Sequence, residues 1–199
     1  PTDMAKRALK NLALANWAKV EADGIEAAKV QYRDANNMTD QMAALRVLVD
    51  SSDEATAQQV LSDFYVQWKD DALVINQWLT VQAGSSGLGT VENIQTLLEH
   101  EAFDWRNPNK VRSVIGAFAS QALVHFHRED GRGYALLTDA VIRLNASNPQ
   151  IASRLLTPLT RWKRLVPSQS QLMKAELQRI MDHGSLSKDV YEVVSKSLV

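Results

Sequence analysis

The 199-residue sequence contains no cysteine, which excludes disulfide bonds and thiolate metal ligands. No apolar run approaches the roughly 18 residues that a membrane-spanning helix needs, and the first residues lack the apolar segment of a signal peptide. An excess of one charge is also missing, because 22 basic residues stand against 23 acidic ones. Neither a nucleic-acid-binding surface nor a polybasic membrane patch is therefore indicated. The lack of cysteine fits a reducing compartment, and we expect a cytoplasmic protein.

Alternating strand patterns are absent too, while helical patterns fill the chain. Apolar residues recur at helical spacing, most cleanly at Ala57, Val60, Leu61, Phe64 and Trp68. Helix starts are expected near positions 3, 39, 71, 109 and 149, at steps typical of helix-pair repeats. The sequence therefore predicts an all-α fold, in which about ten helices form antiparallel pairs that stack into a superhelix of the HEAT or armadillo kind.

Two similar segments, Asn107–Phe118 and Asn148–Leu159, support a repeat. Both begin with Asn-Pro, and the two steps lie 41 positions apart. Asparagine caps a helix because its side-chain oxygen accepts an otherwise unpaired N–H of the first turn. Proline is tolerated next, since its missing N–H would be unpaired at that position in any case. We expect a helix behind each Asn-Pro step.

Each of these predicted helices carries an arginine one turn from its start, Arg112 in the first and Arg154 in the second. Equivalent positions of stacked helix pairs line up on one surface. Two guanidinium groups there would form a site for carboxylate or peptide oxygens. Alternatively, each arginine pairs with a neighbouring acid for structural reasons. These residues alone leave the two interpretations balanced.

Three further motifs suggest chemistry, but each has a simpler explanation. His100-Glu101-Ala102-Phe103-Asp104 has aspartate where a zinc-peptidase helix has its second histidine, and it falls where a helix should end. The pair His125 and His127 is better explained as hydrogen-bonded and partly buried than as metal-binding. The glycine-rich stretch 84–89 lacks both a Walker lysine and a preceding strand, so a flexible connector is favoured over a phosphate-binding loop.

Local signals also predict boundaries and core residues. We expect Asp23-Gly24 to break the first helix, and Thr39 to cap a later helix. Trp105 lies between two charged residues and is expected to be partly exposed. The other tryptophans fall on apolar stripes and are expected in the core: Trp17, Trp68, Trp78 and Trp162.

Four blocks of the sequence resemble the C-terminal α-helical domain of bacterial aminopeptidase N, and the spacing between the blocks matches as well. The resemblance extends from about residue 10 to the end of the chain. The blocks are Ala35–Asp40, Asn107–Phe118, the turn from His127 to Tyr134, and Asn148–Leu155.

The resemblance implies a parent enzyme that uses zinc to remove N-terminal residues from peptides. The zinc-binding helix belongs to an earlier domain, so residues 1–199 would be a single repeat domain, the distal part of the parent's C-terminal domain. Alone it would have no cofactor and no catalytic residues. Its partners would be the parent's catalytic domain and peptide substrates. It would enclose the active-site chamber, with Arg112 and Arg154 facing that chamber and able to meet the carboxylate end of a peptide.

Two other functions compete with this one. A free-standing helical-repeat scaffold would bind a peptide or protein partner on its concave face, and the length of the native open reading frame would distinguish it. An autonomous hydrolase is disfavoured, because neither a nucleophile with its base nor a metal-binding set can be assembled from the sequence.

Overall fold

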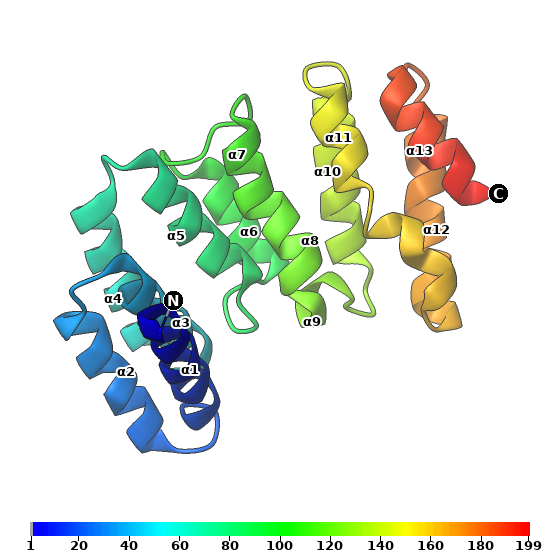
Figure 1. The fold of residues 1–199 in the computed structure, drawn as a ribbon. Helices are drawn as coiled ribbons and strands as arrows, with labels where there is room; N and C mark the ends of the chain where they lie inside the picture. Colours follow the sequence, from blue (N-terminus) through cyan, green and yellow to red (C-terminus); the bar gives the residue numbers. More distant parts are fainter. Residues whose placement is uncertain (1) are drawn as a thin grey trace.

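The computed structural model describes residues 2–199, which form helices joined by short turns and contain no β-strand. Figure 1 shows the helices stacked side by side from the N-terminal end to the C-terminal end. The all-α prediction is confirmed. The elements include a π-helical segment (η1) and a 3-10 helix (η2), and they are α1 (Thr2–Trp17), α2 (Ala22–Asp34), α3 (Met38–Ser51), α4 (Glu54–Trp68), α5 (Ala72–Gly84), α6 (Val91–Glu99), α7 (Pro108–Val111), η1 (Arg112–Gly116), α8 (Ala117–Gln121), α9 (Leu123–Phe126), α10 (Arg132–Asn145), α11 (Pro149–Leu155), η2 (Leu159–Arg164), α12 (Pro167–Asp182) and α13 (Lys188–Leu198).

The predicted helix starts agree with the structure. Helices α1, α3, α5, α7 and α11 begin at Thr2, Met38, Ala72, Pro108 and Pro149. The described elements outnumber the ten or so that were predicted, because α7, η1 and α8 follow one another without a turn and α9 is a single turn. Helix-pair steps could therefore be predicted from the caps and the apolar spacing.

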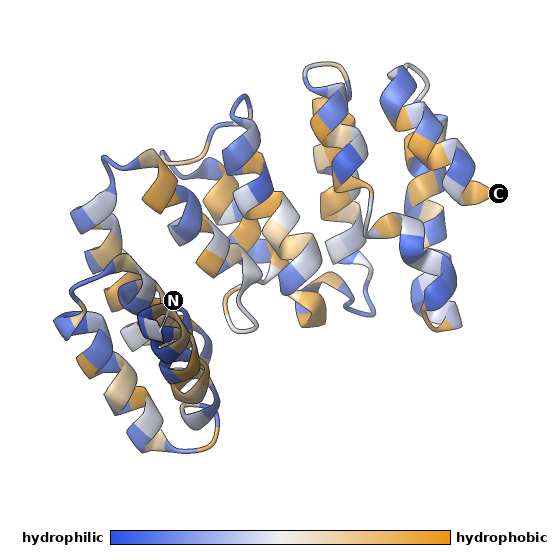
Figure 2. Ribbon diagram, viewed as in Figure 1, coloured by the Kyte–Doolittle hydropathy of each residue, from blue (hydrophilic) through white to orange (hydrophobic). Residues whose placement is uncertain are grey.

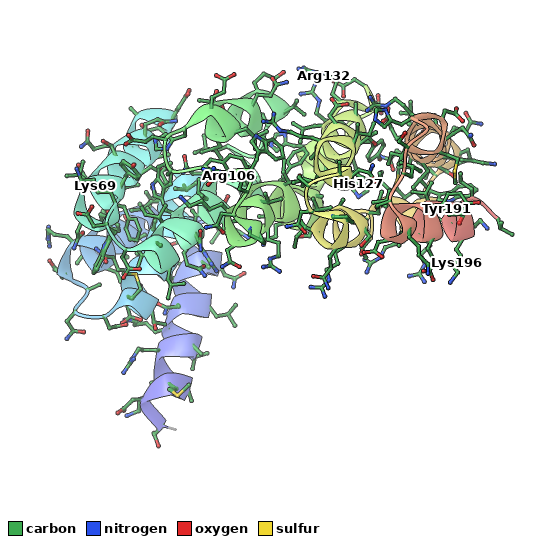
Figure 3. The ribbon with its side chains drawn as sticks, turned by 90° about the horizontal axis from the view of Figure 1, so that it is seen from above. Lys69, Arg106, His127, Arg132, Tyr191 and Lys196 are labelled. Atoms are coloured by element: carbon green, nitrogen blue, oxygen red, sulfur yellow. The ribbon has the colours of Figure 1, made fainter. Side chains whose placement is uncertain are left out.

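The C-terminal two-thirds of the chain forms two rows of helices. Seen from above in Figure 3, α6, α10 and α12 make one row, and α8, α11 and α13 make the other. Helix α10 packs against α11 within its pair and against α12 of the next pair, and α11 packs against α13. Each pair thus covers the apolar side of its neighbour, as expected of a helical-repeat stack.

The hydrophobic core lies between the two rows of helices. Most helices carry both hydrophobic and hydrophilic residues in Figure 2, as expected of amphipathic helices, whereas α5 is largely apolar. One continuous hydrophobic cluster extends from Leu14 in α1 to Val194 in α13. Its fully buried side chains include Phe64, Phe118 and Tyr134. The helices therefore pack around one shared core.

The two Asn-Pro caps form as predicted. The Asn107 side chain accepts hydrogen bonds from the N–H groups of Asn109 and Lys110, and Asn148 accepts one from Ile151. Proline occupies the first turn in both helices. The chain direction at α7 and α11 is therefore set by equivalent local chemistry.

The predicted break at Asp23-Gly24 is wrong by a few residues. Helix α1 ends at Trp17, and α2 already begins at Ala22, so Asp23 lies in the first turn of α2, where its charge suits the helix dipole. Gly24 is required for another reason. A Cβ atom at this position would lie 2.4 Å from the backbone nitrogen of Ala18, closer than atoms can pack. The glycine allows the α1–α2 turn to fold tightly.

Two further expectations need correction. Thr39 lies inside α3, and the cap is Asn37, whose side chain accepts from the N–H of Asp40 at 3.0 Å. Trp17 is 42% exposed, because α1 packs only along one side and buries little beyond Leu14. Among the other tryptophans, Trp78 is buried, and Trp68 and Trp162 are half-buried against the core. Trp105 is half-buried, in line with its prediction.

The buried carboxylate of Asp40 joins α1 to α3. It accepts from the Lys10 ammonium at 2.6 Å, from the Asn11 amide at 3.0 Å and from the Asn37 amide at 3.2 Å. Burial by itself acts to raise the pKa of Asp40, but these bonds outweigh it and lower the pKa below 3.8. The ionised carboxylate is therefore the stabilising form.

We expect Asp40→Ala to reduce the free energy of unfolding by about 1–3 kcal/mol, because Lys10 and the two amides lose their acceptor. Urea denaturation at neutral pH measures the change. Asp34→Ala is the control, since Asp34 is exposed and pairs only with adjacent Arg33. The difference between Asp40→Ala and the native chain should shrink as the pH falls below 3.8 through the lowered pKa of Asp40, because the native carboxylate is then protonated. An equal, pH-independent effect of both substitutions would contradict this role.

Candidate binding surface

Arg112 and Arg154 lie on two segments, η1 and α11, that approach each other at Gly116. Arg112 is the first residue of η1, and Arg154 lies in the last turn of α11. Gly116 is next to both segments, since a Cβ atom on it would lie 3.8 Å from the Arg112 Cβ and 4.0 Å from Leu155 Cδ2. Both arginines are exposed. Arg112 donates to the Asn109 side chain at 2.8 Å.

A cavity of about 540 Å³ opens beside Arg154. It lies where α8, α11, η2 and α12 meet. Its polar lining comes from His127, Arg154, Arg161 and Arg164, together with Ser120 and Thr157. Asp and Glu are absent from the lining. The volume is in the range of small-ligand pockets, well above what a single ion needs.

The local sequence explains why two of these arginines share a side. Pro158 follows the end of α11, and the chain continues as the 3-10 helix η2. Because a 3-10 helix has three residues per turn, side chains three positions apart eclipse one another. Arg161 and Arg164 therefore project together. Trp162, between them in sequence, packs elsewhere and donates its indole N–H to the Ser197 carbonyl at 3.1 Å.

Within the part of the chain that the structure describes, the arginines of this surface form no ion pair. The ion pairs found among residues 2–199 involve none of Arg112, Arg154, Arg161 and Arg164. The alternative that Arg112 and Arg154 pair with neighbouring acids is thus not what the described part of the chain shows. Three uncompensated guanidinium groups around one cavity create a site with positive potential. We define the basic cavity as this pocket with Arg154, Arg161 and Arg164.

His127 forms part of the cavity wall. Its Nδ1 lies 2.9 Å from the hydroxyl of Tyr134, which is completely buried, and Figure 3 places His127 between the two rows of helices. Burial lowers the pKa of His127 below 6.5 and raises that of Tyr134 above 10. Neutral imidazole is therefore the stable form of His127 near pH 7. His125 has a different partner, the Ser86 carbonyl, at 2.7 Å. The prediction that both histidines are hydrogen-bonded and partly buried is therefore confirmed.

The side chains of His100, Glu101 and Asp104 do not come together at one site, because each has a different partner. His100 follows the last residue of α6, and its Nδ1 accepts from the N–H of Ala102 at 3.0 Å. Glu101 accepts from the Tyr65 hydroxyl, and Asp104 pairs with Arg106. Within residues 2–199, no group of three or more His, Asp or Glu side chains is placed to hold a metal ion.

The glycine-rich stretch is a connector, but it is held in place. The Ser85 hydroxyl donates to the Asp50 carboxylate at 2.7 Å, and the N–H of Ser86 donates to the same oxygen at 3.1 Å. A Cβ atom on Gly89 would lie 2.4 Å from the Ser85 carbonyl oxygen. Glycine is needed here because the backbone folds onto itself, and the hydrogen bonds to Asp50 fix the stretch as a connector between α5 and α6.

Comparison with known proteins identifies the domain. Residues 1–199 match the family described as a domain of unknown function (DUF3458_C) with ARM repeats. The chain belongs to this family. This DUF3458_C domain is 40% identical over 196 residues to aminopeptidase N of Haemophilus influenzae, and 38% identical over 197 residues to aminopeptidase N of Escherichia coli.

These matches cover 98% of the DUF3458_C domain and 22% of each relative. Among solved structures, Legionella pneumophila aminopeptidase A in complex with aspartic acid matches with a TM-score of 0.88 and 31% identity. That match covers 96% of this chain and 23% of the other. The resemblance to the C-terminal helical domain of bacterial aminopeptidase N is confirmed. The domain spans about a fifth of its relatives, and none of its described helices is both long and apolar enough to cross a membrane.

Sequence reasoning found Arg154 but missed Arg161, Arg164 and His127 as parts of one cavity. A signal was present in Arg161-Trp162-Lys163-Arg164, the densest basic run in the chain. The run alone does not show which charges share a side. That depends on the 3-10 geometry of η2 and on the neighbouring helices.

The lowered pKa of His127 predicts a dependence of stability on pH. In the unfolded chain His127 takes up a proton at about pH 6.5, whereas in the folded chain it does so only at a lower pH. The neutral imidazole therefore makes its full contribution to the free energy of unfolding above pH 6.5. It is lost as the pH falls from 6.5 through the folded-state pKa. NMR titration of His127 should give a midpoint below 6.5. Urea denaturation of His127→Gln should show that its free energy of unfolding changes less with pH in that window than that of the native chain. An equal pH dependence in both would contradict the lowered pKa of His127.

Proposed function

We propose that this chain is the distal, non-catalytic part of the C-terminal domain of a zinc-dependent aminopeptidase N. In that enzyme it would close the active-site chamber and limit entry to peptides. Two findings support the proposal: the chain belongs to the DUF3458_C family, and it aligns with 22% of the length of aminopeptidase N relatives. The observation that carries the mechanism is the surface of arginines without acidic partners around Arg112 and Arg154.

The proposed mechanism is steric and electrostatic. A stack with one continuous core from Leu14 to Val194 is stiff enough to act as a wall. Exposed guanidinium groups on that wall would attract peptides through carboxylate and carbonyl oxygens. Small neutral substrates offer fewer such groups. The wall therefore acts on the binding of peptides and takes no part in bond cleavage.

Zinc would belong to the parent enzyme, outside this chain. Residues 2–199 bring no set of His, Asp and Glu side chains together that could hold it. No catalytic step is assigned to any residue here. The cytoplasmic location and the extent of the domain over residues 1–199 stay predictions.

In the full-length parent, Arg112→Ala and Arg154→Ala should lower kcat/KM for peptides about five- to tenfold, mainly through KM, because each removes one charge-assisted bond to the substrate. Cleavage of small aminoacyl amide reporters should change less than about twofold. Steady-state kinetics on both substrates tests this. Arg46→Ala is the control: Arg46 is exposed on α3, bonds only to Gln77 and does not line the cavity. An equal loss on peptides and reporters would refute the mechanism.

A second surface supports the proposal that the chain contacts other parts of a parent enzyme. Helix α1 projects from the stack in Figure 3. Its apolar side chains Met4, Leu9 and Leu12 are 74%, 69% and 62% exposed. A row of large apolar side chains on one helix is typical of a packing surface. We infer that the remainder of the parent chain covers it.

If the parent chain covers this surface, the same substitutions should have a small effect on the stability of the 199-residue chain and a large effect on that of the parent. In the 199-residue chain, Leu9→Gln with Leu12→Gln should change the free energy of unfolding by less than about 0.5 kcal/mol, since both side chains are exposed. In the parent, where both would be buried, the same change should cost about 2 kcal/mol or more. Tyr191→Gln, at the other end of the stack and 55% exposed, is the control for both. Equal effects in chain and parent would rule out the contact.

A further inference from the structure

The basic cavity has a second, apolar half. Beside its arginines, the lining includes Leu123, Leu155, Pro158, Leu165 and Met173. Leu123 is 52% exposed, so it presents apolar surface to the opening. A site for an inorganic anion needs only the charged half. The apolar half indicates a ligand that joins an anionic group to a hydrophobic body.

Gly116 leaves room in the wall of this cavity. It is the last residue of η1, in which the backbone forms a π-helical turn that is wider than an α-helical turn. A Cβ atom added to it would meet only ordinary contacts, at 3.8 Å and 4.0 Å. Alanine is thus compatible with the fold at this position, whereas a longer side chain on this lining residue would take up part of the cavity.

We propose that the basic cavity binds the C-terminal residue of a peptide that ends in a large apolar amino acid. Arg154, Arg161 and Arg164 would hold the terminal carboxylate through their forked donors. The apolar side chain would lie against Leu123, Leu155 and Met173. That such a peptide is a natural ligand rests on the proposed function, but the binding site itself stands on the geometry of this chain.

This pocket would give the parent enzyme a preference for the far end of its substrate. Cleavage occurs at the N-terminus of a peptide, whereas the cavity would recognise the free carboxylate and the last side chain. Peptides of suitable length would engage both sites at once and bind more tightly than shorter ones. Substrate length and C-terminal residue would then influence KM.

The test uses the 199-residue chain and two probes, N-acetyl-Ala-Leu as the free acid and the same compound as its C-terminal amide. Isothermal titration calorimetry should show the free acid binding at least about tenfold more tightly than the amide, because only the acid offers a carboxylate. An N-acetyl-Ala-Gly free acid should also bind more weakly than the leucine compound, since it lacks the apolar body. Equal affinity for acid and amide would overturn the proposal.

Variants locate the site. Arg161→Gln with Arg164→Gln should weaken binding of the free acid about tenfold or more. Lys163→Gln is the matched control, because it removes one charge from the same 3-10 helix but does not line the cavity. Gly116→Leu should block binding, and Gly116→Ala should keep the chain folded by circular dichroism. An equal loss with Lys163→Gln would assign binding to general charge and refute the site.

Competition with inorganic phosphate tests whether the cavity binds any anion. If phosphate competes with N-acetyl-Ala-Leu at equal affinity, the cavity is a plain anion site and the proposal fails. The probe comparison needs no variant, so the test survives a substitution that prevents folding. Its outcome is also independent of the kinetics proposed for the parent. The cavity can bind the free acid even if Arg112→Ala leaves peptide cleavage unchanged, and the reverse can also occur.

Discussion

The structure depends on burial of each helix pair against its neighbours. A single amphipathic pair exposes an apolar face that it cannot cover by itself, so stability comes from the contact with the next pair. The packing of α10 on both α11 and α12, and of α11 on α13, shows this dependence directly. At the N-terminal end, α1 packs mainly against α2 and α3 and leaves Met4, Leu9 and Leu12 exposed. The same requirement therefore accounts for the rigid middle of the stack and for the exposed face of α1.

Local caps convert this stack into an ordered surface. Asn107 and Asn148 start α7 and α11 with the same chemistry, and each start is followed within two turns by an exposed arginine, Arg112 in the first case and Arg154 in the second. The π-helical segment η1 then separates α7 from α8 next to Gly116, and Pro158 redirects the chain into η2. Positive charge gathers where these irregular elements meet. Regular packing supplies the scaffold, and departures from it shape the cavity.

The proposed role of this chain in substrate binding is distinct from catalysis. The titratable groups that line the cavity are arginines and the half-buried, neutral His127, and they form no pair of a nucleophile with an adjacent base. Membership of the DUF3458_C family and the match to a fifth of each aminopeptidase N relative agree with such a division of labour. The polar network at Asp40 and the apolar side of α1 lie far from the cavity and serve the architecture.

The sequence by itself determined the all-α class, the helix-pair steps and the Asn-Pro caps, because capping and helical periodicity act between residues close in the chain. The binding role of Arg112 and Arg154 stays a prediction. Short-range signals misplaced the α1–α2 turn at Gly24, since that turn depends on a backbone contact. Trp17 was assigned to the core because periodicity shows a stripe but not whether anything covers it. Only the tertiary structure brought Arg161, Arg164 and His127 to Arg154, because a cavity forms from segments far apart in sequence whose relative placement is decided by packing.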